Sequence, residues 1–254
     1  MDYFHHKDGR LWCEGVPLDL LAKEVGTPAY VYSKQTVVEH VDKLKTAFSE
    51  FDPLICFALK ANGTLALLDV VRKAGAGFDV VSGGELERVL KVGADPKSIV
   101  FAGVGKTVAE MERAIRAGIL FFNVESEEEL EVLAAVAARM RRRAGVAIRL
   151  NPDVDPKTHT YISTGKKESK FGVDIERGEA LARRALALPS LELRALQCHI
   201  GSQLTTVEPY VQALERTVAL AERIREDAPS LAYIDMGGGF GIYYKDTAAP
   251  AIEA

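Results

Sequence analysis

The feature that most constrains the fold is a repeating order of apolar run, polar turn, helical stretch and glycine that begins at Pro53. Short apolar runs of this kind predict strands buried on both faces. Strands that alternate with helices, without hairpin signals between them, predict parallel strands joined by crossover helices. The strands are expected at 53–60, 77–82, 98–103, 119–125, 145–151, 192–200 and 231–236.

Helix boundary signals agree with this order. Three expected helix starts carry a hydroxyl residue with a glutamate three positions later, a pattern in which side chains satisfy free N–H groups of the first turn. These pairs are Ser82–Glu85, Thr107–Glu110 and Ser126–Glu129. Glycine closes many helices because it adopts the left-handed conformation there. The expected closing glycines are Gly75, Gly93, Gly118 and Gly145.

Seven such strands predict an α/β fold of the (β/α)8, TIM-type barrel class. A barrel of eight strands does not close with seven. We therefore expect a barrel truncated after the seventh strand and a chain that is a fragment. Residues 1–32 are expected to be a lead-in segment, with a short helix closed by Gly26 and a β-rich run at 27–32. The incomplete barrel is expected over 33–254, and its first helix is expected to start at Ser33.

Composition narrows the class of protein. The chain of 254 residues is 48% hydrophobic, and its formal net charge of −4 offers no basic field for nucleic acid or an anionic membrane. No stretch approaches the roughly 20 apolar residues of a membrane span. Cys13, Cys56 and Cys198 lie far apart without a C-x-x-C motif. This spacing predicts a reducing, cytoplasmic setting, and neither a disulfide framework nor a metal site is expected.

Lys60 ends the apolar run that starts at Pro53, and the apolar pattern stops at Asn62. Most lysines at such a position are simply solvated. In a barrel, however, the carboxyl ends of the strands carry the active site. An amine placed there and activated by its surroundings can act as a nucleophile. Alternation along the strand predicts that Lys60 shares the interior face with Leu54, Cys56 and Ala58.

Two further strand ends carry candidate binding groups. Gly237, Gly238 and Gly239 follow the last expected strand, where barrels often bind phosphate through backbone N–H groups. A tight turn is the alternative reading. His199 ends the preceding strand and could pack on a flat ligand, although a buried core histidine is the commoner case. Ser202 could bind phosphate or cap a helix.

Asp79 and Arg149 are charged groups at the expected barrel mouth, and either could instead be half of a structural ion pair. The long segment 152–172 lacks periodicity and is expected to be a lid. A lysine, a phosphate cradle and a histidine at one end of a barrel together suggest pyridoxal 5′-phosphate, which acts as an electron sink.

These residues lie in motifs that resemble the diaminopimelate decarboxylase family, within the alanine-racemase-like barrel type of pyridoxal-phosphate-dependent enzymes. The motifs occur in family order along nearly the whole chain. They are 57–62, 77–85, 149–152, 158–165, 169–172, 199–203 and 235–241. The segment 151–172 is typical of diaminopimelate decarboxylases, whereas the lysine, histidine and triple-glycine motifs are shared with ornithine and arginine decarboxylases.

The resemblance implies that Lys60 forms the Schiff base and that His199 stacks on the cofactor ring. Ser202 and the three glycines 237–239 would lie near the phosphate, Asp79 beside the lysine, and Arg149 near the cofactor. The implied reaction is decarboxylation at the D-centre of meso-diaminopimelate, giving L-lysine. The implied assembly is a homodimer with shared active sites.

The family continues beyond this sequence with an eighth strand, a Glu-Pro-Gly-Arg segment and a C-terminal β-domain. The resemblance implies that the glutamate of that segment pairs with the pyridine nitrogen, and no substitute for it is identified here. Three alternatives therefore stay open. The first is a decarboxylase of another diamino acid (ornithine or arginine type). The second is a non-catalytic decarboxylase-like fragment, and the third is a barrel that binds a sugar phosphate.

Overall fold

A computed structural model of the chain describes residues 3–154 and 171–242. The N-terminal segment forms a small antiparallel sheet of β1 (Phe4–Lys7), β2 (Arg10–Cys13) and β3 (Val16–Pro17), followed by α1 (Leu18–Val25). Asp8 and Gly9 join the first two strands with φ angles of 51° and 72°, and an Asp-Gly pair favours such a hairpin turn. This hairpin was not predicted from the sequence. As expected, α1 ends at Gly26.

The β-rich run expected at 27–32 forms no strand. Its backbone is not paired with a neighbouring strand, and Tyr30 is 91% exposed. β-propensity alone does not make a strand, because a strand also needs a partner to pair with. The run instead leads to α2 (Lys34–Ala47), whose N-cap is Ser33 as expected, with the Ser33 hydroxyl accepting from the Thr36 N–H at 3.0 Å.

The remainder of the described chain is the expected α/β barrel portion. Its strands are β4 (Cys56–Ala58), β5 (Gly77–Val80), β6 (Ile99–Phe101), β7 (Phe121–Val124), β8 (Ala144–Asn151), β9 (Val173–Asp174), β10 (Leu191–Cys198) and β11 (Tyr233–Asp235). Its helices are α3 (Leu65–Lys73), α4 (Gly83–Lys91), α5 (Val108–Ala117), α6 (Glu127–Arg139), α7 (Ile175–Leu186) and α8 (Glu208–Ile224). Short 3₁₀ turns occupy Ser49–Phe51, Leu59–Ala61 and Pro96–Ser98.

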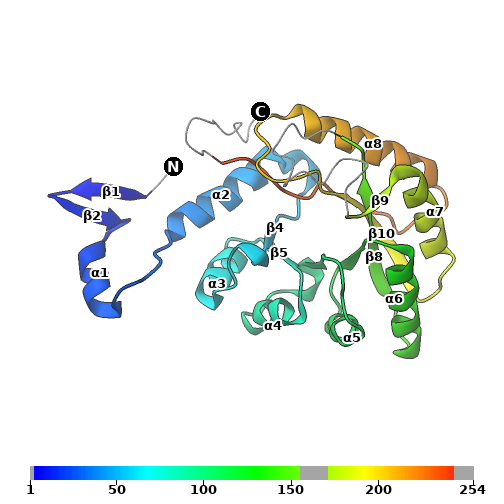
Figure 1. The fold of residues 1–254 in the computed structure, drawn as a ribbon, viewed down its shortest axis with the longest axis horizontal. Coiled ribbons are helices and arrows are strands. Elements are labelled where there is room, and N and C mark those ends of the chain that lie inside the picture. The colour runs from blue at the N-terminus through cyan, green and yellow to red at the C-terminus, as the bar shows by residue number, and fades with distance from the viewer. Residues whose placement is uncertain (1–2, 155–170, 243–254) are drawn as a thin grey trace.

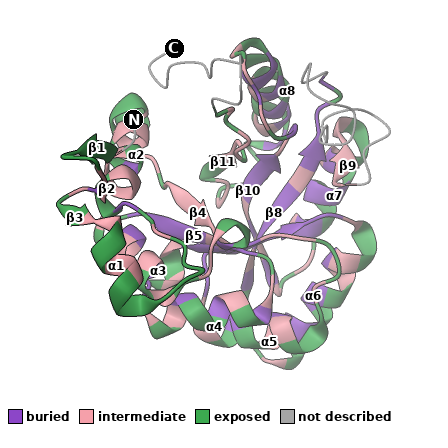
Figure 2. Cartoon of the chain, turned by 60° about the vertical axis from the view of Figure 1, so that its left-hand side comes forward, coloured by how far each residue is buried: buried purple, intermediate pink, exposed green. Residues whose placement is uncertain are grey.

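All strands of this sheet pair in parallel, in the order β11-β10-β8-β7-β6-β5-β4, and β9 adds to β8. The sheet curves, and α3 to α8 follow one another around its outer side (Figure 1). The buried strands lie inside this ring, while the outward faces of the helices are exposed (Figure 2). The predicted TIM-type barrel with seven successive parallel strands is thus confirmed.

The two faces of the curved sheet bury different side chains. The main core lies between the sheet and the helices and includes Phe78, Phe101 and Phe122. A separate apolar cluster lies on the inner face, with Val100, Phe121, Ala147 and Ala195 as buried members and Cys56 packed against it. Because successive strand residues point to opposite faces, the residues two positions after these face the interior nearer the carboxyl ends. Those positions include Asn123, Arg149 and Gln197.

Most helix boundary signals are confirmed, with one refinement. Ser82, Thr107 and Ser126 each accept from the N–H of the glutamate three residues later. Only Thr107 and Glu110 form the reciprocal box. The other two glutamates reach one residue further back: Glu85 accepts from the Val81 N–H at 2.7 Å, and Glu129 from the Glu125 N–H at 3.0 Å.

The expected closing glycine at 145 is wrong. Gly75, Gly93 and Gly118 have left-handed φ angles of 77°, 77° and 78°, but Gly145 lies inside β8. The turn after α6 instead places Arg141 in the left-handed region, with φ of 52°. Gly145 is needed for a different reason, since an added Cβ would lie 2.3 Å from the Leu120 carbonyl oxygen.

Candidate active site

Lys60 lies at the carboxyl edge of the sheet, but not on a strand. β4 ends at Ala58, and residues 59–61 form a 3₁₀ turn. The strand is therefore shorter than the predicted 53–60, but Leu59 is 2% exposed in the helix-facing core, on the side opposite the one that alternation assigns to Lys60. Lys60 itself is exposed. Its positive charge still influences both Asp79 and His199, which places the amine close to both side chains.

Asp79 and Asp235 form a pair of inner-face carboxylates. Asp79 lies opposite Ala58 in the β4–β5 register, and Asp235 lies opposite Gln197 in the β10–β11 register. Burial, with a contribution from the charge of Asp235, raises the pKa of Asp79 to about 7. Burial likewise raises the pKa of Asp235. Two nearby carboxylates resist being ionised together, so Asp79 can gain or lose a proton near neutral pH.

Asp235 also orders the loop that follows its strand. Its Oδ1 accepts from the Gly237 N–H at 2.8 Å, and its Oδ2 accepts from the Asn123 side chain at 3.4 Å. Gly237 and Gly239 have left-handed φ angles of 69° and 89°. An added Cβ at Gly239 would lie 1.9 Å from the Gly201 carbonyl oxygen. The loop 237–239 therefore packs directly on the loop after β10.

Gly238, the middle glycine of this loop, differs from its neighbours in having open space beside it. No atom lies within 4 Å of a Cβ added at Gly238, so its outer side is open. Its N–H is held by His199, whose Nδ1 accepts at 3.3 Å, and its carbonyl accepts from the Tyr210 hydroxyl at 3.1 Å. The ring of Tyr210 stacks on that of Phe240 at 5.2 Å between centroids. The structure thus fixes the glycine loop from both sides and leaves one face free.

His199 is half-buried after the end of β10. Burial, with smaller contributions from the charges of Arg149 and Lys60, lowers its pKa to about 4. The imidazole is therefore neutral at physiological pH, as a ring that packs on a flat ligand requires. Ser202 is exposed and follows Gly201, which contacts the glycine loop. The two loops that carry His199, Ser202 and the glycines are therefore brought together as predicted.

Arg149 faces the barrel interior and forms an ion pair with Glu125. Arg149 Nη1 donates to Glu125 Oε1 at 2.9 Å, and the two side chains are 11% and 3% exposed. The guanidinium also lies 5.0 Å from the centroid of the Phe171 ring. The structural ion pair left open from the sequence is therefore present, and it positions Arg149 at the same end of the barrel as Lys60.

Several buried oxygen atoms at this end have no hydrogen-bond partner among the described residues. They are Asp79 Oδ1, Asn123 Oδ1, Glu125 Oε2 and Gln197 Oε1. Unpaired buried acceptors are rare in folded proteins and indicate groups that a ligand or water completes. Together with the open side of Gly238 and the Lys60 amine, they form a site whose chemistry fits a phosphate-bearing aldehyde with hydrogen-bonding ring substituents.

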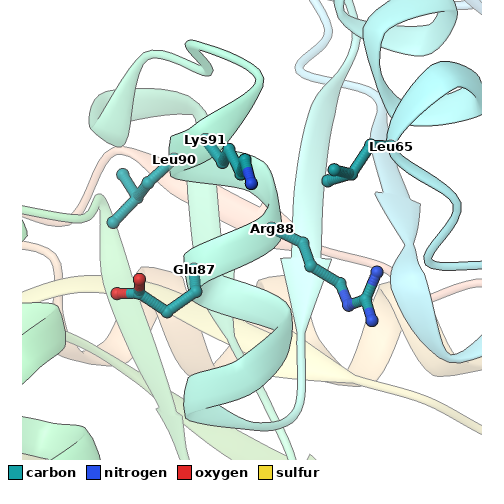
Figure 3. A pocket seen from close by; sticks show the side chains of 5 residues that line it. All are labelled: Leu65, Glu87, Arg88, Leu90 and Lys91. Carbon is teal, nitrogen blue, oxygen red and sulfur yellow. The ribbon is translucent and has the colours of Figure 1, made fainter.

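A second hollow lies outside the barrel, between α3 and α4 (Figure 3). It is lined by Leu65, Glu87, Arg88, Leu90 and Lys91. Arg88 donates to the Gly63 carbonyl oxygen at 3.0 Å and so braces the loop that follows Lys60. The charged side chains that line this hollow are exposed, and it contains none of the inner-face groups described above.

No group of three or more His, Cys, Asp or Glu side chains in the described parts of the chain is arranged to hold a metal ion. Within the same residues, no helix combines the length and apolar character needed to span a bilayer. The three cysteines are free. The expected lid includes residues 155–170, which lie outside the described residues.

Comparison with known families identifies the class of protein. The family described as "Pyridoxal-dependent decarboxylase, pyridoxal binding domain" matches residues 34–253. The chain belongs to this family, which confirms pyridoxal phosphate as the cofactor type that the sequence predicted.

Within this family the chain is similar to diaminopimelate decarboxylases. It is 47% identical over 251 residues to that of Vibrio cholerae and 48% identical over 250 residues to that of Pseudomonas aeruginosa, covering 98% of this chain in both cases. The crystal structure of diaminopimelate decarboxylase from Helicobacter pylori with L-lysine superposes with a TM-score of 0.89 at 38% identity, over 93% of this chain and 60% of that one.

The chain spans 60% of the length of these two curated relatives. A lysine/ornithine decarboxylase from Vibrio vulnificus shares only the fold, with a TM-score of 0.77 at 23% identity over 93% of this chain and 59% of that one.

The side chains that support the predicted site residues were not predicted from the sequence. Asn123 and Glu125 were covered only by the expected strand 119–125, and Asp235 only by the motif 235–241. Tyr210 gave no signal, because it is one aromatic residue on an amphipathic helix. The inner-face position of Gln197 is readable from alternation within its strand once the register of that strand is known.

Proposed function

We propose that the protein to which this chain belongs is a pyridoxal-phosphate-dependent carboxy-lyase that converts meso-diaminopimelate to L-lysine, by decarboxylation at the D-centre. The observation that supports this most strongly is the grouping of Lys60, Asp79, His199 and the loop 237–239 at one end of the barrel, in a chain nearly half identical to diaminopimelate decarboxylases. The corresponding biological role is lysine biosynthesis.

The residues have distinct roles in this proposal. Lys60 holds the aldehyde carbon of the cofactor, while the Ser202 hydroxyl and the open face of the loop 237–239 lie near its phosphate. His199 packs its neutral ring against the cofactor ring, and Arg149 lies at the cofactor's edge. When bound, the cofactor supplies a conjugated ring that stores the electron pair released as carbon dioxide leaves.

Asp79 acts as the proton acceptor and donor for the Lys60 amine. A pKa of about 7 lets the carboxyl accept a proton from the Lys60 ammonium and return it. Asp79 Oδ1 is buried without a hydrogen-bond partner among the described residues and is free to take up that proton. The amine is then neutral, which is the form that reacts with an aldehyde.

The proposal extends to the domain bounds, the assembly and the cellular location of the protein. Residues 1–32 are a lead-in segment, and residues 33–254 are the cofactor-binding barrel portion. The active protein is a homodimer with shared sites, and it works in the cytoplasm. The length of the relatives supports the view that further residues take part in the intact protein.

Release of carbon dioxide from carboxyl-labelled meso-diaminopimelate tests the substrate assignment, with the natural-length protein and added cofactor. We expect release from this substrate and little from ornithine or arginine. Release from ornithine or arginine alone would favour the other diamino-acid decarboxylases, which the shared fold of the Vibrio vulnificus enzyme keeps as the second candidate. No release from any of them, with cofactor bound, would favour a non-catalytic relative.

A further inference from the structure

Lys106 is a fully buried cation behind the candidate site. Its side chain is 1% exposed and lies between β6 and β7, in the loop before α5. Its Nζ donates three hydrogen bonds, to the Gly103 carbonyl at 2.7 Å, the Asn123 carbonyl at 2.7 Å and Glu129 Oε1 at 2.6 Å. The ammonium thus uses all three of its donors inside the protein.

One path of contacts leads from Lys106 to Arg149. The carboxylate that accepts from Lys106 uses its other oxygen to accept from the Glu125 N–H at 3.0 Å. Glu125 in turn holds Arg149 through the 2.9 Å ion pair. Each link is short, and each of these side chains is largely buried.

A second path leads from Lys106 to the glycine loop. The Asn123 carbonyl accepts from Lys106, and the Asn123 side chain donates to Asp235 Oδ2. Asp235 accepts from the Gly237 N–H. The two paths diverge from the single strand end 123–125, which Lys106 holds through both the backbone of Asn123 and the carboxylate of Glu129.

We propose that Lys106 is a positioning residue, whose ammonium fixes the strand end 123–125 so that Asn123 and Glu125 hold the glycine loop and Arg149 in the cofactor-binding geometry. A buried ammonium fixes position strongly, because moving it would leave a charge and three acceptors unpaired in the protein interior. Lys106 contacts none of the groups assigned to the cofactor, so its effect is transmitted through the two paths. This inference rests on the proposed function for the identity of the ligand only.

The test compares Lys106→Met with Lys45→Met in the natural-length protein. Lys45 is a suitable control because it is a half-buried lysine that likewise donates to a backbone carbonyl, that of Ala74 at 2.5 Å, without any link to residues 123–125. Two quantities are measured. The first is the Kd of pyridoxal 5′-phosphate, and the second is hydrogen exchange of the cofactor-free protein over 121–126, 147–151 and 235–239.

We expect Lys106→Met to raise the Kd at least tenfold and to speed exchange in all three segments. For Lys45→Met we expect a Kd within twofold of the parent and unchanged exchange there. Lys106→Arg, which keeps the cation, is expected to recover part of the lost affinity. The proposal is overturned if the Kd of Lys106→Met matches that of the control, or if its exchange rises evenly over the whole barrel.

A milder variant keeps the test decisive if Lys106→Met does not fold. Glu129→Gln removes the charge and keeps one acceptor oxygen, so the side chain can accept from Lys106 or from the Glu125 N–H but not from both. It is expected to raise the Kd about threefold and to speed exchange at 121–126; no change in either quantity would refute the proposal. If the parent binds no cofactor, the proposed function fails, and the exchange comparison alone then decides the role of Lys106.

Discussion

His199 Nδ1 accepts a hydrogen bond from the Gly238 N–H at 3.3 Å, which ties the loop after β10 to the loop after β11. Because Nδ1 is the acceptor, the neutral ring carries its proton on Nε2. One side chain thus serves both as a neutral ring beside Lys60 and as an anchor for the glycine loop.

Removing this acceptor should loosen the glycine loop. His199→Ala leaves the Gly238 N–H without its partner, whereas His199→Asn places an acceptor oxygen near the former Nδ1 position. We expect faster hydrogen exchange over 236–240 in the alanine variant and near-parental exchange in the asparagine variant. The loss of one such bond corresponds to roughly tenfold faster local exchange. Equal exchange in the two variants would show that ring packing, and not the hydrogen bond, orders the loop.

Gly238 and Gly239 should respond differently to alanine. At Gly239 an added Cβ meets the Gly201 carbonyl oxygen and φ is 89°, so Gly239→Ala should lower stability by roughly 2 kcal/mol or more. At Gly238 the space is open, so Gly238→Ala should leave urea unfolding within about 0.5 kcal/mol of the parent while weakening binding of pyridoxal 5′-phosphate. Unchanged cofactor affinity in Gly238→Ala would place the phosphate elsewhere.

Asp79 should make the cofactor-free protein less stable as pH rises. Its folded pKa of about 7 lies above the ordinary 3.8, so the folded state holds the proton more tightly than the unfolded chain. Its favourable contribution is full below pH 3.8 and is lost as pH rises through about 7. The groups that act on Asp79 are Asp235 and Glu85, which raise its pKa, and Lys60 and Arg149, which lower it.

Asp79→Asn should therefore stabilise the protein at pH 8, by on the order of 1–3 kcal/mol, and change little at pH 4. His199 contributes the opposite slope between pH 4 and 6.5, but it is common to both proteins and cancels in the difference. Asp69→Asn is the matched control, because the Lys73 and Arg72 hydrogen bonds lower the pKa of Asp69 and neutralising it should not stabilise. Equal stabilisation by both variants would contradict this account.

Glu110 should contribute more to stability than a surface glutamate of the same helix. It accepts from the Gly83 N–H at 2.7 Å and the Thr107 N–H at 2.9 Å, and thus caps both α4 and α5. We expect Glu110→Ala to lower the unfolding free energy by about 1–2 kcal/mol. Glu112→Ala, which removes an exposed ion pair with Arg139, should change it by less than about 0.5 kcal/mol. Similar losses would mean that Glu110 acts only through charge.

Much of the barrel was predictable because local signals repeat. The caps at Ser82, Thr107 and Ser126 are encoded within a few residues, and the apolar strands between them favour parallel strands joined by helices. Gly145 was misassigned because a glycine after a helix has two possible causes that look the same in sequence. It can close the helix, or it can sit where a neighbouring backbone leaves no room for a Cβ. The left-handed residue that closes the turn after α6 is Arg141, and an arginine gives no sequence signal for that conformation.

The site was predictable only in part. Lys60, His199 and the glycines stand at ends of apolar runs, and that position is visible in the sequence. The partners of these residues come from other strands: Glu125 meets Arg149, and Asn123 reaches Asp235, 112 residues away. Such pairings depend on the register between strands, which no local pattern specifies. The same holds for Lys106, which the sequence presents as an ordinary polar loop residue.

The central claim is that Lys60 carries the cofactor, and one measurement tests it most directly. The natural-length protein is mixed with pyridoxal 5′-phosphate, reduced with borohydride, digested and analysed by mass spectrometry. The account predicts the reduced cofactor's added mass on the peptide that contains Lys60, and its loss in Lys60→Ala with no new site of attachment. Stoichiometric attachment to another lysine, or none in a protein that binds the cofactor, would contradict the account.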